Sequence, residues 1–188
     1  MNVHNAGTMN NILPKAILFD LDDTILVTNV MADQIWKEVC ESFSKRLTPI
    51  DHNTLLNAIR EQREWYWKDP HRHRLGRLRI SNARLDIVSG VFKRLSIQDL
   101  ALPQEMADRH LTLSNNAMHP SKGSLETLQR LKDKGVRLSL VTNGSQETQR
   151  HKINRFGLEP FFDCILVEGE FGLGKPDERV YRHVLKQL

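Results

Sequence analysis

Short apolar runs, each followed by polar residues, predict buried strands in this chain. Residues 15–21 are KAILFDL, residues 136–141 are VRLSLV and residues 164–167 are CILV. Such short runs of Ile, Leu, Val and Phe are typical of strands buried on both faces. Helical patterns separate these runs, so we expect right-handed βαβ units around a parallel sheet.

Two helices are expected beside these strands, at residues 124–134 and 145–156. Ser124 is a suitable N-cap for the first helix. Gly135 and Gly157 suit the positive φ that often ends a helix. The strands and helices together predict an α/β fold.

Residues 27–118 differ, because they show helical periods and no convincing strand. One apolar stripe consists of Ile35, Trp36, Val39, Cys40 and Phe43, and another of Ile80, Ile87, Val88, Val91 and Leu95. We therefore expect a Rossmann-like core of residues 14–26 and 119–188. A helical domain of residues 27–118 is inserted in it, and residues 119–123 return the chain to the core.

The composition fits a globular protein, with 39% hydrophobic and 27% charged residues among 188. No apolar run approaches the roughly 20 residues that span a bilayer. The first fifteen residues lack the basic and apolar regions of a secretory signal, and we expect a short disordered leader or a mis-assigned start. Cys40 and Cys164 are the only cysteines and are expected to be buried free thiols, which favours a cytoplasmic location.

Positive charge is concentrated in residues 60–84, which hold eight Lys or Arg against three Asp or Glu. This segment could bind an anion or form a solvated helix face, and both readings stay open. Trp65, Tyr66 and Trp67 could stack bases, but large aromatic side chains more often pack helices together. Nucleic acid is therefore disfavoured as a partner.

A cluster of acidic residues ends the first predicted strand, in the run Asp20-Leu21-Asp22-Asp23-Thr24. In an extended strand, Asp20 and Asp22 would point to the same side, where their repulsion calls for a cation or a shared proton. A turn with an Asx cap is the alternative reading. An EF-hand loop is excluded because Ile25 occupies the position that needs glycine, and no Walker phosphate loop is present.

Two further segments follow the other strands. Thr142, Asn143 and Gly144 follow the second strand and open a helix, where a hydroxyl and N–H groups suit a bound anion. Lys175 lies in the segment GKPD after the third strand. Alone, Thr142 is typical of a strand-end cap and Lys175 of a surface charge. Ligands bind beyond the carboxyl ends of parallel strands, so we expect all these groups in one crevice.

The motifs FDLDDT, LVTNG and GKPD resemble motifs I, II and III of the haloacid dehalogenase-like hydrolase superfamily. The helical insert resembles a C1-type cap. The run that begins at TNGSQETQ is similar to the phosphatase branch that includes N-acetylneuraminate-9-phosphatase and nucleotidases. The resemblance implies a Rossmann-like core, Mg²⁺ and an aspartyl-phosphate intermediate.

The resemblance also assigns roles to individual residues. Asp20 is the nucleophile, and Asp22 is the general acid and base, which dehalogenases of the superfamily lack. The expected Mg²⁺ ligands are the Asp20 carboxylate and the Asp22 backbone carbonyl. Lys175 stabilises charge on nucleophile and phosphate. Thr142, Asn143 and Gly144 are the expected phosphate-binding residues.

The expected activity is Mg²⁺-dependent hydrolysis of a small anionic phosphomonoester, such as a sugar phosphate or a nucleotide. Arg72 and Arg74 in the insert are candidates for reading a second negative group of that substrate.

One family feature is missing from the sequence. A fourth motif, an acidic turn after a further strand, would supply another Mg²⁺ carboxylate, and none precedes the last residue, Leu188. We therefore expect a core truncated at its C-terminus, or one completed by a second copy in a homo-oligomer that covers the open sheet edge. The alternative function is a catalytically weak or inactive phosphate-binding or interaction module.

Overall fold

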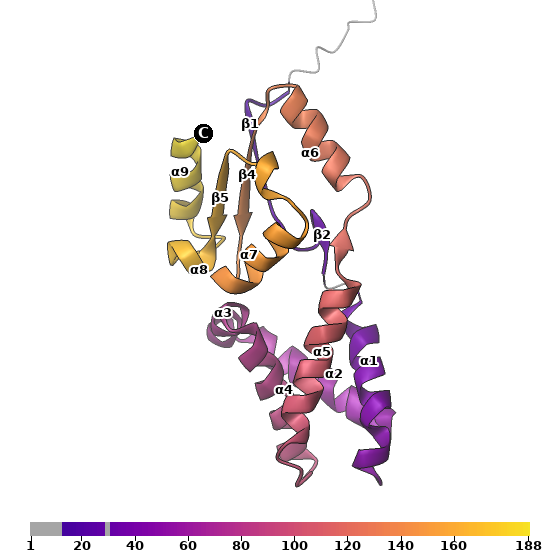
Figure 1. The fold of residues 1–188 in the computed structure, drawn as a ribbon. Helices are drawn as coiled ribbons and strands as arrows, with labels where there is room; N and C mark the ends of the chain where they lie inside the picture. Colours follow the sequence, from indigo (N-terminus) through magenta and orange to yellow (C-terminus); the bar gives the residue numbers. More distant parts are fainter. Residues whose placement is uncertain (1–12, 29–30) are drawn as a thin grey trace, which may run out of the picture.

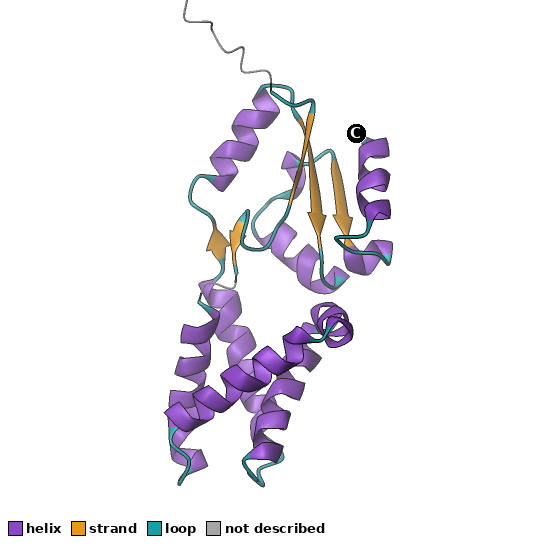
Figure 2. Cartoon of the chain, turned by 180° about the vertical axis from the view of Figure 1, so that it is seen from behind, coloured by secondary structure: helices purple, strands orange, loops and turns teal. Residues whose placement is uncertain are grey.

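A parallel sheet forms the centre of the α/β unit (Figures 1 and 2). The computed structural model describes residues 13–28 and 31–188. Strand β4 (Arg137–Thr142) pairs on one side with β1 (Ala16–Phe19) and on the other with β5 (Cys164–Val167). The order is therefore β1-β4-β5, and β1 has no strand on its outer side within the described residues. A second copy along this edge stays a prediction.

Apolar side chains from the two faces of β4 pack against different helices. Leu138 and Leu140 join one cluster with Leu128 of α6 (Ser124–Asp133) and Ile153 of α7 (Gln146–Arg155). Val141 joins a second cluster with residues of α9 (Glu178–Gln187). Alternation along the strand thus produces the predicted two-sided burial. Two short helices flank β5 in the sequence: η2 (Glu159–Phe161) precedes it and α8 (Glu168–Phe171) follows it.

The chain passes between the α/β unit and the inserted helices through a small antiparallel pair. Strand β2 (Leu26–Val27) pairs with β3 (His119–Pro120), so the expected linker begins as a strand. The prediction of Ser124 as an N-cap was wrong: Gly123, at φ 76°, caps α6. The Ser124 hydroxyl donates instead to the Ile25 carbonyl at 3.0 Å, joining the start of α6 to the chain before β2.

The inserted segment is helical, as predicted. It contains α1 (Ala32–Phe43), η1 (Ser44–Leu47), α2 (His52–Lys68), α3 (Pro70–Leu78), α4 (Ile80–Arg94) and α5 (Leu102–Ala117). We call these helices the bundle. Both predicted stripes contribute to an apolar cluster in the bundle, which includes Trp36, Val39, Ile87 and Val91. The carboxyl ends of β4 and β5 point toward the bundle (Figure 2).

The two cysteines differ in exposure. Cys40 is buried in the bundle, and burial raises the pKa of its thiol to about 12. Cys164 is only partly buried, so its predicted burial was wrong, because it opens β5 at the end remote from the bundle. Within residues 13–28 and 31–188, no helix has the length and apolar character needed to cross a bilayer. The predicted leader falls mostly on residues 1–12, outside the described part of the chain.

Candidate active site at the carboxyl ends of the strands

Asp20 and Lys175 lie in contact, as their strand-end positions predict. The Lys175 ammonium is 2.6 Å from Oδ1 of Asp20. The same oxygen accepts a hydrogen bond from the Leu21 N–H at 2.7 Å, so Oδ2 takes part in neither contact. The Asp20 side chain is 45% exposed. A charged oxygen that solvent can reach thus lies beside a fixed cation.

The Asn143 side chain holds the segment that contains Lys175. Its amide nitrogen donates to the Lys175 carbonyl at 2.8 Å, and its oxygen accepts from the Lys175 N–H at 2.7 Å. This double hydrogen bond ties the loop after β4 to the segment between α8 and α9. Binding of phosphate by the Asn143 backbone stays a prediction.

Asp22 has different partners from Asp20. Its Oδ1 lies 2.6 Å from the Lys152 ammonium, and its Oδ2 accepts from the Gln149 amide at 3.0 Å. The premise of an extended strand through Asp22 was wrong: β1 ends at Phe19, and Asp23 has a φ of 56°. The chain turns after Asp20, which explains the separate partners of the two carboxylates.

Thr142 is connected to Asp22 through one side chain. The Gln149 amide nitrogen also donates to the Thr142 hydroxyl, at 2.5 Å. Gln149 and Thr142 are both 1% exposed. The predicted phosphate-binding hydroxyl and the predicted acid therefore share one buried donor.

Gly144 contacts a carboxylate. Its N–H donates to Oε2 of Glu168 at 3.1 Å, so this N–H is engaged within the protein. Binding of phosphate by Gly144 stays a prediction. Glu168, 1% exposed, also forms a two-pronged ion pair with Arg77 of α3, each N···O distance being 2.7 Å. A Cβ on Gly174 would lie 2.5 Å from the Glu168 carboxyl carbon, so only glycine permits this close approach.

The sequence reasoning missed Gln149, Lys152, Glu168 and Arg77. Glu168 follows a buried strand directly, which is the signal that identified Asp20 and Thr142. Gln149 and Lys152 are three residues apart on α7 and so lie on one helix face. No local pattern connects them to Asp22, which lies 127 and 130 positions away in the sequence.

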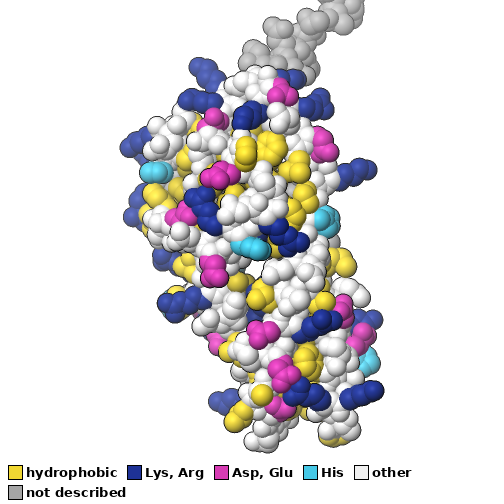
Figure 3. Space-filling view, viewed as in Figure 1, with side chains coloured by type: hydrophobic (Ala, Val, Ile, Leu, Met, Phe, Trp, Pro, Cys, Tyr) yellow, Lys and Arg dark blue, Asp and Glu magenta, His cyan; other side chains and the backbone are white. Residues whose placement is uncertain are grey.

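The basic segment does not form a continuous anion-binding stripe. Arg60 pairs with Asp33, and Arg77 pairs with Glu168. The Arg72 guanidinium lies 3.7 Å from the ring centre of Trp65 and donates to the Trp65 and Tyr66 carbonyls. On the face shown in Figure 3, basic side chains are interspersed with acidic ones.

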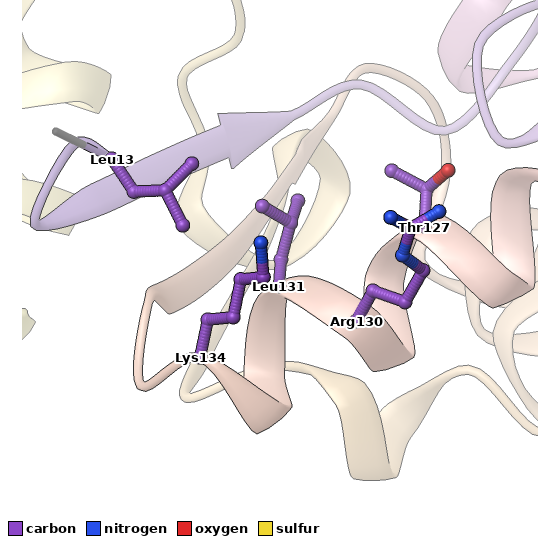
Figure 4. A pocket seen from close by; sticks show the side chains of 5 residues that line it. All are labelled: Leu13, Thr127, Arg130, Leu131 and Lys134. Atoms are coloured by element: carbon purple, nitrogen blue, oxygen red, sulfur yellow. The ribbon is translucent and has the colours of Figure 1, made fainter. Parts of the chain in front are cut away.

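The aromatic cluster is divided in the same region. Tyr66 is buried and Trp67 packs against the bundle's apolar cluster, as predicted. Trp65 is 54% exposed, although the Arg72 guanidinium lies over one face of its ring. A hollow of about 150 Å³ lies elsewhere, between the start of β1 and α6 (Figure 4). Its lining is Leu13, Thr127, Arg130, Leu131 and Lys134. It contains none of the strand-end residues.

Residues 14–188 match the family of haloacid dehalogenase-like hydrolases. The chain belongs to this family. The match includes all the strand-end residues described above. Its core is therefore a hydrolase core of the haloacid dehalogenase-like type.

Curated members of the family support a phosphatase activity. The glyceraldehyde 3-phosphate phosphatase of Methanocaldococcus jannaschii is 27% identical over 181 residues, which cover 93% of this chain and 71% of that protein. The phosphorylated carbohydrates phosphatase of Thermotoga maritima is 24% identical over 174 residues, covering 93% and 70%.

Solved structures confirm the fold. The magnesium-bound HAD-hydrolase YfnB from Bacillus subtilis matches with a TM-score of 0.63 at 21% identity, covering 93% of this chain and 72% of that one.

The family generally uses Mg²⁺, and the residues present fit it in part. Mg²⁺ usually takes one or two carboxylates, with water and substrate phosphate completing its shell. Asp20 offers a carboxylate oxygen and Asp22 a backbone carbonyl. No group of three or more His, Cys, Asp or Glu side chains suited to a metal occurs in the described chain. Binding of Mg²⁺ by the Asp20 carboxylate and the Asp22 carbonyl therefore stays a prediction.

Proposed function

We propose that this chain is a phosphomonoester hydrolase with Asp20 as nucleophile. The contact of Asp20 with Lys175 carries the proposal, since it pairs a solvent-accessible carboxylate with a cation at the end of a parallel strand. Thr142, at the end of the adjacent strand, would donate to the phosphoryl group. The curated phosphatases of the family support the same chemistry.

The reaction takes two steps in this proposal. An Asp20 oxygen attacks phosphorus, the bond to the leaving oxygen breaks, and that oxygen takes a proton from Asp22. Water then attacks the aspartyl-phosphate and gives a proton to Asp22, which restores both carboxyl groups and releases phosphate. Lys175 stabilises the negative charge on the phosphoryl oxygens in both steps.

Mg²⁺ would be held by Asp20 and the Asp22 carbonyl. When bound, it would neutralise the repulsion between the nucleophile and the phosphoryl oxygens.

We further propose that residues 27–118 act as a cap over a core formed by residues 14–26 and 119–188. The bundle has its own apolar cluster and is joined to the core through β2 and β3. The ion pair between Arg77 and Glu168 links α3 to the start of α8, directly after β5. The magnesium-bound crystal structure of YfnB reveals an interdomain movement. A cap of this kind would select small substrates such as sugar phosphates or nucleotides.

The alternative is a phosphate-binding or interaction module with weak or no turnover. The lack of a third acidic metal ligand among the described residues favours it. The complete set of Asp20, Asp22, Thr142 and Lys175 opposes it, because binding alone needs no general acid.

A panel of phosphomonoesters, assayed with and without Mg²⁺, separates these proposals. The wild type should release phosphate in a Mg²⁺-dependent manner, and Asp20→Asn, which keeps the shape but loses the charge, should not. Asp133→Asn, an exposed change on α6, is the matched control and should behave as the wild type. Calorimetric binding of phosphate without turnover on any substrate would support the binding module instead.

A further inference from the structure

Helix α7 presents two polar side chains to Asp22. Lys152 contacts Oδ1 at 2.6 Å, and Gln149 donates to Oδ2 at 3.0 Å. Both oxygens of the carboxylate are therefore engaged by one helix. Ser145 caps that helix by accepting from the Thr148 N–H, so the start of α7 is itself fixed.

These contacts differ from ordinary surface pairs. The Lys152 side chain is 11% exposed, Asp22 27% and Gln149 1%. A solvated pair such as Arg182 with Glu178, at 70% and 74% exposure, contributes little and fixes no geometry. A buried network in which each member has a partner holds its side chains in one arrangement.

Gln149 also links Asp22 to a second strand end. Its amide nitrogen donates to the Thr142 hydroxyl at 2.5 Å as well as to Asp22. The separation between the Asp22 carboxylate and the Thr142 hydroxyl is thus set by one buried side chain.

We propose that Gln149 and Lys152 are positioning residues that place the Asp22 carboxyl group at the leaving oxygen of a phosphate held by Thr142. This role rests on the proposed hydrolysis, in which Asp22 gives its proton to that oxygen as the P–O bond breaks. Neither residue touches the reacting atoms in this scheme. Lys152 acts through Asp22, and Gln149 acts through both Asp22 and Thr142.

The role predicts a dependence on the leaving group. An alkoxide leaves poorly without a proton, whereas nitrophenolate is a weak base that leaves unassisted. Lys152→Met should lower kcat/KM by about 100-fold on an alkyl phosphate such as glycerol phosphate, since a misplacement near 1 Å can have that effect. The same variant should lose no more than about 3-fold on para-nitrophenyl phosphate.

The experiment compares both substrates in Lys152→Met, Gln149→Leu, Asp22→Asn and the double variant Asp22→Asn/Lys152→Met. Lys152→Arg should restore much of the alkyl phosphate activity, because it returns the cation. Lys186→Met, an exposed change of the same charge on α9, should match the wild type. In the Asp22→Asn background, Lys152→Met should cause no further loss on the alkyl phosphate.

An equal loss on both substrates, or a further loss in the Asp22→Asn background, would overturn the positioning role while leaving the phosphatase intact. Thermal unfolding of each variant shows whether such a loss reflects the fold. Turnover that survives Asp20→Asn would instead overturn the proposed hydrolysis, so the two failures are distinguishable.

Discussion

The α/β core and the bundle bury charged groups in different ways. In the core, Glu168 is buried with a guanidinium and an N–H as partners. In the bundle, Nη1 of Arg84 and Nε2 of His110 are buried, and the described residues offer neither a hydrogen-bond partner. A buried polar atom without a partner costs about 1–3 kcal/mol.

Burial in the bundle also lowers the pKa of both groups. Desolvation lowers the pKa of His110 to about 3, with the charges of Arg84 and Arg63 adding to the effect. Desolvation lowers the pKa of Arg84 to about 10. The comparison shows that Glu168 is paired where the strand ends converge, whereas in the bundle a buried nitrogen of Arg84 has no hydrogen-bond partner among the described residues.

The largest effect should come from removing a paired charge at the strand ends. Lys175→Met should lower kcat by about 10²–10³-fold, because it deletes a preorganised cation beside the nucleophile. Steady-state kinetics on the best substrate of the panel measures this, with Lys186→Met as control. A loss below 10-fold would mean that Lys175 is a structural partner of Asp20 only.

The next effect should follow from breaking the pair between Arg77 and Glu168. Glu168→Gln should lower the free energy of unfolding by about 2 kcal/mol, because the pair is mostly removed from solvent. Arg182→Met, which breaks an exposed pair, should change it by a few tenths. Urea unfolding measures both variants. Equal effects of the two changes would contradict the distinction between the largely buried pair of Arg77 with Glu168 and the exposed pair of Arg182 with Glu178.

Lowering the pH should reduce the free energy of unfolding, because His110 is buried without a proton. Below pH 6.5 the unfolded chain takes up a proton at this residue and the folded chain does not, down to a pKa of about 3. The stability that the protein derives from a neutral His110 is fully present above pH 6.5. Below pH 6.5, the free energy of unfolding falls by at most about 1.4 kcal/mol per pH unit from this residue. His110→Phe, which preserves the ring, should flatten the fall between pH 6.5 and pH 5. An unchanged slope would contradict the burial of a neutral imidazole.

The smallest effect is expected at Arg84. Arg84→Met should leave the free energy of unfolding unchanged or raise it by about 1 kcal/mol, because it removes an unpaired buried charge. Denaturant unfolding measures the change. A clear destabilisation together with weaker substrate binding would show that Arg84 has an anionic partner after all.

The sequence predicted the features that depend on neighbouring residues. The three strands were visible because each is a short apolar run, and Asp20, Thr142 and Lys175 because each follows such a run. The C-terminal end of α7 was predicted within a residue, and Gly157 does adopt a positive φ of 60°.

The features that were missed depend on distant residues. Gln149 and Lys152 are 127 and 130 positions from Asp22, and Arg77 is 91 positions from Glu168. No local pattern encodes such contacts. Ser124 was misassigned for the same reason, since its hydroxyl prefers a carbonyl 99 positions away over the end of its own helix.

The central claim is that Asp20 becomes phosphorylated during turnover. The direct measurement is an acid quench of the protein during turnover of a substrate labelled in its phosphoryl group, followed by peptide mapping of the label. The account predicts a hydroxylamine-sensitive label on the peptide that contains Asp20, absent in Asp20→Asn. Phosphate release by the wild type with no label on that peptide, or an equal label in Asp20→Asn, would contradict it.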